Sequence, residues 1–218
     1  MKYFNFKRSF GKLPNTYIIS PVILGMLVFG IMYTRLLLND SNIDGVVYFE
    51  NGEYEKAMDA FNDYLLLKPH DTKTLYNRGR CYEILGKREA AIEDYYNVID
   101  RDPENINALI SCTQALYKSE KYKSAVNVGS YAVLVDENNY LAHYYYARAN
   151  HKYGDLNQAL TSYNKAIDIN PDFGLAYFQR GSLMLTVGFK PFACYDLKAA
   201  YNLNVEGAKE ALEKYCSK

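Results

Sequence analysis

A period of 34 residues runs through most of the sequence and constrains the fold more than any other feature. The first recurring position is small and holds Gly45, Gly79, Thr113, Ala147 and Gly181. A second small position holds Ala57, Ala91, Ala125, Ala159 and Ala193. A bulky position holds Phe61, Tyr95, Gly129, Tyr163 and Leu197, and a terminating position holds Pro69, Pro103, Glu137, Pro171 and Val205. Small residues let two helices cross closely and proline ends a helix, so the period predicts five pairs of helices.

This pattern resembles the tetratricopeptide repeat (TPR), a helix-turn-helix unit, over about residues 38–205. The resemblance implies an all-α, right-handed solenoid of five repeats, at residues 38–71, 72–105, 106–139, 140–173 and 174–205. Repeat three departs from the family pattern at Thr113, Gly129 and Glu137, but the register on both sides of it is unbroken. Residues 206–218 have an amphipathic helical pattern, which predicts a polar helix that caps the end of the solenoid.

Residues 17–38 are almost entirely apolar, with Arg35 as their one charged residue. A helix rises about 1.5 Å per residue, so this segment is long enough to cross a hydrocarbon layer of about 30 Å. A cleavable signal peptide is disfavoured by the absence of a small-residue cleavage site, and a buried core helix by the self-contained core of the repeats. We therefore expect a membrane-anchored protein with one transmembrane helix at residues 17–38.

The charges flanking this segment predict its orientation. Four basic residues precede it within residues 1–16, namely Lys2, Lys7, Arg8 and Lys12, whereas Asp40 and Asp44 follow it. The positive-inside rule then makes residues 1–16 a basic cytoplasmic tail and places the repeats on the other side of the membrane. We expect a single-pass protein of a bacterial inner membrane with periplasmic repeats.

The four cysteines show no metal-binding spacing, and the three histidines complete no ligand set. If the last repeat helix and the cap form an antiparallel pair that turns near Val205, Cys194 and Cys216 lie opposite each other. They could then form a disulfide, and the alternative is two small buried hydrophobic residues. Cys81 and Cys112 are expected to fill space between helices.

Enzymatic motifs are absent from the sequence. It contains no glycine-rich phosphate loop, no HExxH motif and no nucleophile with a plausible base, so we expect a protein that is not an enzyme and needs no cofactor or metal. The chain from Asp40 onward carries 20 basic and 25 acidic residues, a net charge of −5, which disfavours nucleic acid as a partner.

Recognition of a protein or peptide remains, and in the family it takes place on the concave wall that the first helices line. The corresponding positions here are Asn42, Val46, Phe49, Tyr76, Arg80, Glu83, Ile110, Gln114, Tyr117, Tyr144, Arg148, His151, Phe178, Ser182 and Leu185. From these we select seven partner-binding residues: Tyr76, Arg80, Gln114, Tyr117, Tyr144, Arg148 and Phe178. Tyr76 and Tyr144 lie one helical turn before Arg80 and Arg148, so each pair could present a stacked contact.

One known TPR function does not fit these positions. Family members that grip the acidic tails of cytosolic chaperones use a clamp of Lys and Asn residues with one Arg, spread over three repeats. No frame of three repeats here reproduces that clamp.

The sequence therefore predicts a membrane-anchored TPR scaffold that takes part in assembling or organising a bacterial envelope complex. Two alternatives remain open. One is a receptor on a eukaryotic organelle membrane that captures imported proteins, and the other is a permanent accessory subunit of a membrane enzyme complex.

Overall fold

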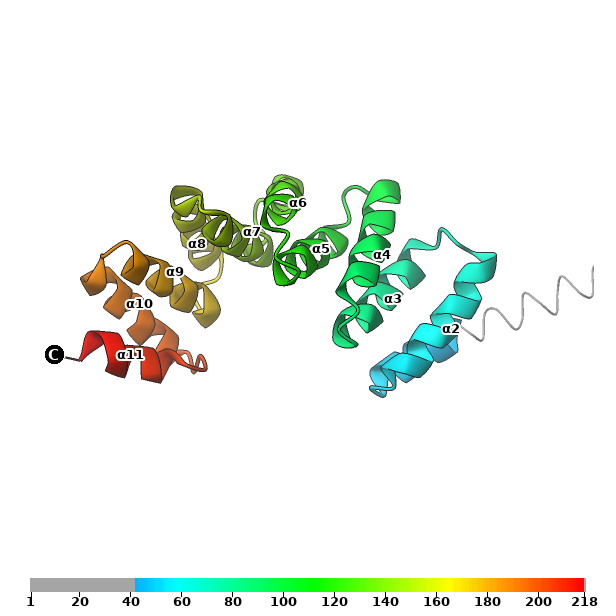
Figure 1. The fold of residues 1–218 in the computed structure, drawn as a ribbon, viewed down its shortest axis with the longest axis horizontal. Helices are drawn as coiled ribbons and strands as arrows, with labels where there is room; N and C mark the ends of the chain where they lie inside the picture. Colours follow the sequence, from blue (N-terminus) through cyan, green and yellow to red (C-terminus); the bar gives the residue numbers. More distant parts are fainter. Residues whose placement is uncertain (1–41, 218) are drawn as a thin grey trace, which may run out of the picture. The chain divides into compact units, whose positions relative to one another are not determined.

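The computed structural model describes residues 42–217, which form an array of consecutive helices (Figure 1). Residues 42–50 are helical. They are followed by α2 (Tyr54–Leu67), α3 (Thr72–Ile84), α4 (Arg88–Arg101), α5 (Ile106–Lys118), α6 (Tyr122–Val135), α7 (Tyr140–Tyr153), α8 (Leu156–Ile169), α9 (Gly174–Thr186), α10 (Lys190–Asn202) and α11 (Ala208–Cys216). Each expected repeat range contains two helices, and the prediction of an all-helical solenoid is confirmed for this part of the chain.

The basic tail at residues 1–16 and the membrane helix at residues 17–38 lie outside the described residues. Between residues 42 and 217, none of the helices combines the length and the apolar character needed to cross a bilayer.

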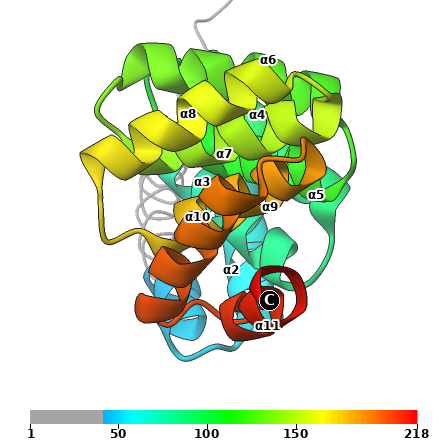
Figure 2. The ribbon, with the colours of Figure 1, turned by 90° about the vertical axis from the view of Figure 1, so that its left-hand side faces the viewer.

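Each helix packs on the next one along the chain, so neighbouring repeats share a continuous core. Asp71, Asn105 and Asn139 cap the first turns of α3, α5 and α7 by accepting hydrogen bonds from backbone amides. At the far end α11 packs on α10, and Figure 2 views the array from this end, with α11 nearest the reader.

The first small position and the bulky position contact each other within a repeat. A Cβ atom added to Gly45 would lie 2.5 Å from the Phe61 ring, and one added to Gly79 would lie 2.7 Å from the Tyr95 ring. Both rings are fully buried, so neighbouring atoms prevent them from moving away from an added Cβ atom. Glycine at these positions is therefore required by the close approach of the two helices.

Repeat three fills the same space with the two sizes exchanged. Thr113 occupies the glycine position and Gly129 occupies the aromatic position. A Cβ atom on Gly129 would lie 3.1 Å from the Thr113 methyl carbon and 3.2 Å from the Tyr146 backbone. In repeat three the larger side chain is therefore on the first helix and the glycine on the second, and the two helices still pack closely at this point.

The turns between the paired helices use a left-handed residue once every 34 residues. Gly52, Gly86, Gly154 and Gly188 have φ between +74° and +103°, and Glu120 takes this conformation in repeat three with φ +59°. An L-residue with a side chain pays a conformational penalty at such a position, whereas glycine does not. Repeat three therefore has a strained turn where the other four repeats have a relaxed one.

Candidate functional site

The first helices of the repeats, namely residues 42–50, α3, α5, α7 and α9, present what we call the first-helix face. Beyond its paired helix, α7 also contacts α5 and α9, so these three first helices lie side by side. All seven residues predicted to bind a partner lie on these helices. Tyr76 and Arg80 are on α3, Gln114 and Tyr117 on α5, Tyr144 and Arg148 on α7, and Phe178 on α9.

Two arginines of this face each stack on an aromatic ring of the preceding repeat. The guanidinium carbon of Arg80 lies 4.4 Å from the ring centroid of Phe49, and that of Arg148 lies 4.3 Å from the ring centroid of Tyr117. In both cases the ring comes from a residue 31 positions earlier, on the preceding first helix. These cation–π contacts bridge adjacent repeats and place two cations at equivalent points of one face.

The predicted pairing of each arginine with a tyrosine on its own helix is only partly correct. The ring beneath Arg80 is Phe49 rather than Tyr76. Arg148 does approach Tyr144, at 5.5 Å, but more closely approaches Tyr117. The pairing differs because the arginine side chains extend across the gap between repeats.

Tyr144 requires a correction, because its side chain is only 3% exposed. Its ring packs edge-on against Tyr145 and Phe173, with centroids 5.1 and 4.9 Å away, and lies 6.3 Å from the Tyr163 ring. The expectation that Tyr144 offers a free contact to a partner is therefore wrong. The buried Tyr144 ring is one of the aromatic rings that the Arg148 guanidinium contacts.

Of the other predicted residues, Tyr76, Gln114 and Phe178 are half-buried and Arg80 is exposed. The Tyr76 hydroxyl lies 3.4 Å from the Ser111 hydroxyl on α5, and its ring packs against Tyr95. A ring atom of Phe178 lies 3.8 Å from the Cβ position of Gly207, just before the capping helix. The structure thus brings together Tyr117, Tyr144 and Arg148, and no contact joins Tyr76 or Arg80 to these three among the described residues.

Buried ionic clusters in repeats two and five were not predicted from the sequence. Arg78 donates hydrogen bonds from Nε and Nη2 to the two carboxylate oxygens of Asp94, at 2.8 and 2.7 Å, and from Nη1 to Asn62 at 2.9 Å. Asp94 is 2% exposed, so its charge is stabilised by this bidentate contact rather than by water.

The same cluster recurs three periods later in the chain. Arg180 donates to both carboxylate oxygens of Asp196 at 2.7 Å and to Asn164 at 2.6 Å. In each cluster the asparagine, arginine and aspartate are 16 residues apart. That spacing is the signal that could have identified them, and each cluster ties three successive helices together.

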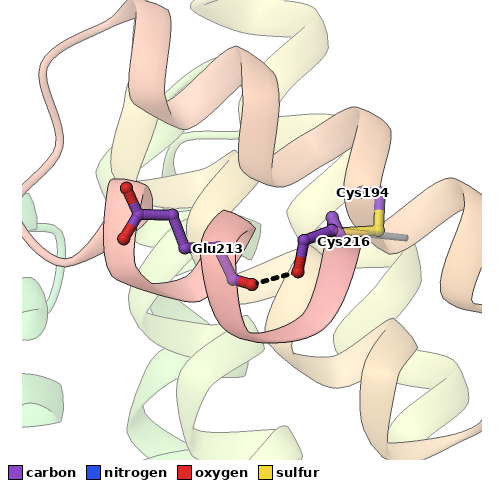
Figure 3. Close-up of a disulfide and its surroundings, with 4 residues drawn as sticks. Cys194, Glu213 and Cys216 are labelled. Atoms are coloured by element: carbon purple, nitrogen blue, oxygen red, sulfur yellow. Dashed lines mark hydrogen bonds between the residues drawn. A yellow bond between two sulfur atoms is a disulfide. The ribbon is translucent and has the colours of Figure 1, made fainter.

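The structure joins Cys194 of α10 to Cys216 of α11 in a disulfide, with the two Cα atoms 5.7 Å apart (Figure 3). Ala208 is the one fully buried residue of α11, and Ala211 and Leu212 are half-buried. The disulfide adds a covalent link between the capping helix and the last repeat. Cys81 and Cys112 are free and buried, and burial raises the pKa of their thiols to about 11 and about 12, so neither is a reactive thiolate.

No cluster of His, Cys, Asp and Glu in residues 42–217 is arranged to hold a metal ion.

Three family profiles match the chain. Two are described as tetratricopeptide repeat and cover residues 45–71 and 72–105, and one described as TPR repeat covers residues 147–188. The chain contains tetratricopeptide repeats. The unmatched stretch between residues 105 and 147 holds repeat three, where the exchange of Thr113 and Gly129 changes the residues by which such a repeat is recognised.

Several curated proteins are similar in sequence to this chain. Anaphase-promoting complex subunit 3 of Schizosaccharomyces pombe is 25% identical over 175 residues, which cover 78% of this chain and 26% of that protein. BBSome complex member BBS4 of Bos taurus is 26% identical over 172 residues, 74% of this chain and 33% of that protein. The chain thus spans a third or less of these relatives.

Solved structures share the TPR fold. The structure of MamA from Desulfovibrio magneticus RS-1, residue 41 to the end, has a TM-score of 0.72 at 18% identity over 77% of this chain and 95% of that one. YrrB, described as a TPR protein with an unusual peptide-binding site, has a TM-score of 0.67 at 19% identity over 79% of this chain and 90% of that one. At these identities the likeness shows the fold alone.

Proposed function

We propose that this TPR protein is a scaffold that binds a protein or peptide on its first-helix face while residues 17–38 anchor it in a bacterial inner membrane. The observation that carries the binding function is the pair of arginines stacked on aromatic rings at equivalent points of one face, Arg80 on Phe49 and Arg148 on Tyr117. Arginine and aromatic residues dominate the energetics of protein interfaces. YrrB, a structural neighbour, is itself described as having a peptide-binding site.

The location of the repeats outside the cytoplasm rests on two independent features. The basic residues before the apolar segment favour a cytoplasmic amino terminus. The disulfide between Cys194 and Cys216 is a bond that persists in oxidising compartments such as the periplasm and is rare in the cytosol. Both features support repeats that face the periplasm, where the scaffold would help to assemble or organise an envelope complex.

Site-specific photocrosslinking in intact cells tests the binding face. A photoreactive residue at Gln114, on α5, should give a discrete adduct with a partner, whereas one at the 77% exposed Leu134, on α6, should not. Arg80→Glu should reduce the yield of the Gln114 adduct at least tenfold, while Arg88→Glu on α4 serves as the matched control and should leave it unchanged. Adducts from Leu134 alone would place the partner on the second helices and contradict the proposal.

The anchor and its orientation have a separate test. The full chain should sediment with membranes and resist carbonate extraction, and a reporter fused after residue 218 should be active only outside the cytoplasm. A full chain that is soluble without detergent, or a reporter active in the cytoplasm, would contradict this part of the proposal.

A further inference from the structure

The solvent-facing side of α10 carries large aromatic side chains. Phe192 and Tyr195 leave 65% and 73% of their surfaces exposed, and Phe189, the N-cap residue of the helix, leaves 56% exposed. Lys190 and Lys198 are also exposed, and we call these five residues the α10 surface. Exposed apolar side chains gathered in one place mark a site of interaction, so this surface calls for an explanation.

The repeat architecture does not require these aromatic residues. The positions equivalent to Phe189 in the period of 34 residues are all charged, namely Glu53, Lys87, Lys121 and Asp155. Those equivalent to Phe192 are Lys56, Ala90, Ser124 and Gln158, and those equivalent to Tyr195 are Asp59, Glu93, Asn127 and Thr161. Repeat five alone is aromatic at all three positions, and because the side chains are exposed, the packing of the helices does not account for them.

The charge of this part of the chain is also distinct. Asp196 is the one carboxylate in residues 173–205, and it is buried and bound to Arg180. Lys190 and Lys198 make no ion pair within the described residues. The cap α11, by contrast, exposes acidic as well as basic residues. In a chain that is net acidic beyond its apolar segment, the α10 surface is therefore cationic.

The charges distinguish between two occupants of this surface. A two-fold contact of the α10 surface with a second copy of itself would bring both lysines of each copy into one interface, with no exposed carboxylate to neutralise them. An anionic bilayer fits better, because aromatic rings and long lysine side chains are typical of protein surfaces that lie at lipid headgroups. The rings enter the boundary between headgroups and acyl chains, and the ammonium groups meet the lipid phosphates.

We propose that the α10 surface binds an anionic phospholipid bilayer, with Phe189, Phe192 and Tyr195 among the headgroups and Lys190 and Lys198 against lipid phosphates. A chain anchored through its amino-terminal segment is already held beside a bilayer, so a weak surface contact is sufficient. The contact gives the array a second attachment at its carboxyl-terminal end. This inference goes beyond the proposed function, because α10 is a second helix and takes no part in the first-helix face.

Tryptophan fluorescence tests the inference, because the chain contains no tryptophan of its own. Tyr195→Trp places an indole on the α10 surface, and Glu93→Trp places one at the equivalent exposed position of repeat two as the matched control. The full chain is reconstituted into vesicles of equal parts phosphatidylcholine and phosphatidylglycerol with brominated acyl chains, which quench an indole that enters the bilayer. A chain that does not insert is added to the same vesicles from outside. Quenching should be at least threefold stronger in Tyr195→Trp than in Glu93→Trp.

Charge variants in the Tyr195→Trp chain attribute the contact to anionic lipid. Lys190→Gln combined with Lys198→Gln should lower the quenching at least twofold, as should vesicles of phosphatidylcholine alone. The control, Lys123→Gln combined with Lys165→Gln at exposed positions of α6 and α8, should leave it unchanged. Circular dichroism melting verifies that each variant is folded.

Three results would overturn the inference. The first is equal quenching of Tyr195→Trp and Glu93→Trp, and the second is quenching that does not depend on lipid charge. The third is an emission shift of Tyr195→Trp that needs no lipid and grows with protein concentration, which would place a second copy on the α10 surface. The crosslink from Gln114 is measured separately, so the proposed function stands or fails independently of these results.

Discussion

Repeats two and five differ from repeats three and four in how their interiors are built. The outer pair buries an arginine–aspartate contact, Arg78 with Asp94 and Arg180 with Asp196, whereas the equivalent positions of the central pair are Cys112 with Val128 and Tyr146 with Ser162. The buried charges of repeats two and five are satisfied by the fold itself. The central repeats instead carry Arg148, whose charge the described residues leave uncompensated. The comparison teaches that an arginine of the first helices can be held either by a buried carboxylate, as Arg78 and Arg180 are, or by aromatic rings, as Arg148 is.

Loss of a paired aspartate should have the largest effect on stability. Asp94→Ala leaves Arg78 half-buried without its partner, which should lower the free energy of unfolding by about 3–5 kcal/mol. The matched change in repeat four, Ser162→Ala, removes one hydrogen bond from Gln158 and should cost about 1 kcal/mol. Urea denaturation of the full chain in detergent, followed by circular dichroism, measures both. Equal losses would mean that the ionic cluster is not a stabilising feature of the outer repeats.

Repeats two and three should also differ in how their stability responds to a change at the first small position, Gly79 in repeat two and Thr113 in repeat three. Gly79→Ala places a Cβ atom 2.7 Å from the buried Tyr95 ring, an overlap that should cost about 1–3 kcal/mol and outweigh the gain in helix propensity of about 1 kcal/mol. Thr113 already carries a side chain at the equivalent place, so Thr113→Ala should lower stability by only about 1 kcal/mol through its lost methyl group and its hydrogen bond to Leu109. The same denaturation series compares the two. A stabilised Gly79→Ala variant would show that the helices of repeat two do not cross as closely as described.

The turn of repeat three should give the smallest effect, with the opposite sign. Glu120→Gly relieves the left-handed strain at φ +59° and should raise the free energy of unfolding by about 0.5–1 kcal/mol. Gly86→Glu installs the repeat-three turn in repeat two and should lower stability by about 1 kcal/mol. Shifts of the thermal midpoint in opposite directions would support the comparison, and a destabilising Glu120→Gly would contradict it.

The fold could be predicted from the sequence because helix pairing depends on residues within one 34-residue period. The possible pairing of Cys194 with Cys216 followed from the same local geometry. The contacts of the arginines could not be predicted, because Arg80 and Arg148 reach rings of the preceding repeat and the angle between repeats decides which ring they meet. The burial of Tyr144 has the same origin, since Tyr145 and Phe173 close over a ring that the helical register alone would place at the surface.

The reversed sizes of Thr113 and Gly129 also restrict how the interior of repeat three can change one residue at a time. From an arrangement with glycine first and an aromatic residue second, a first change at position 113 would force a side chain into an occupied space. A first change at position 129 would instead leave a cavity until position 113 enlarged. Both intermediates lose stability, because overpacking costs about 1–3 kcal/mol and loss of a buried aromatic side chain about 3–5 kcal/mol, and in either order the second change restores what the first removed. The two positions should therefore show strong epistasis, and variation at one of them among natural sequences should track variation at the other.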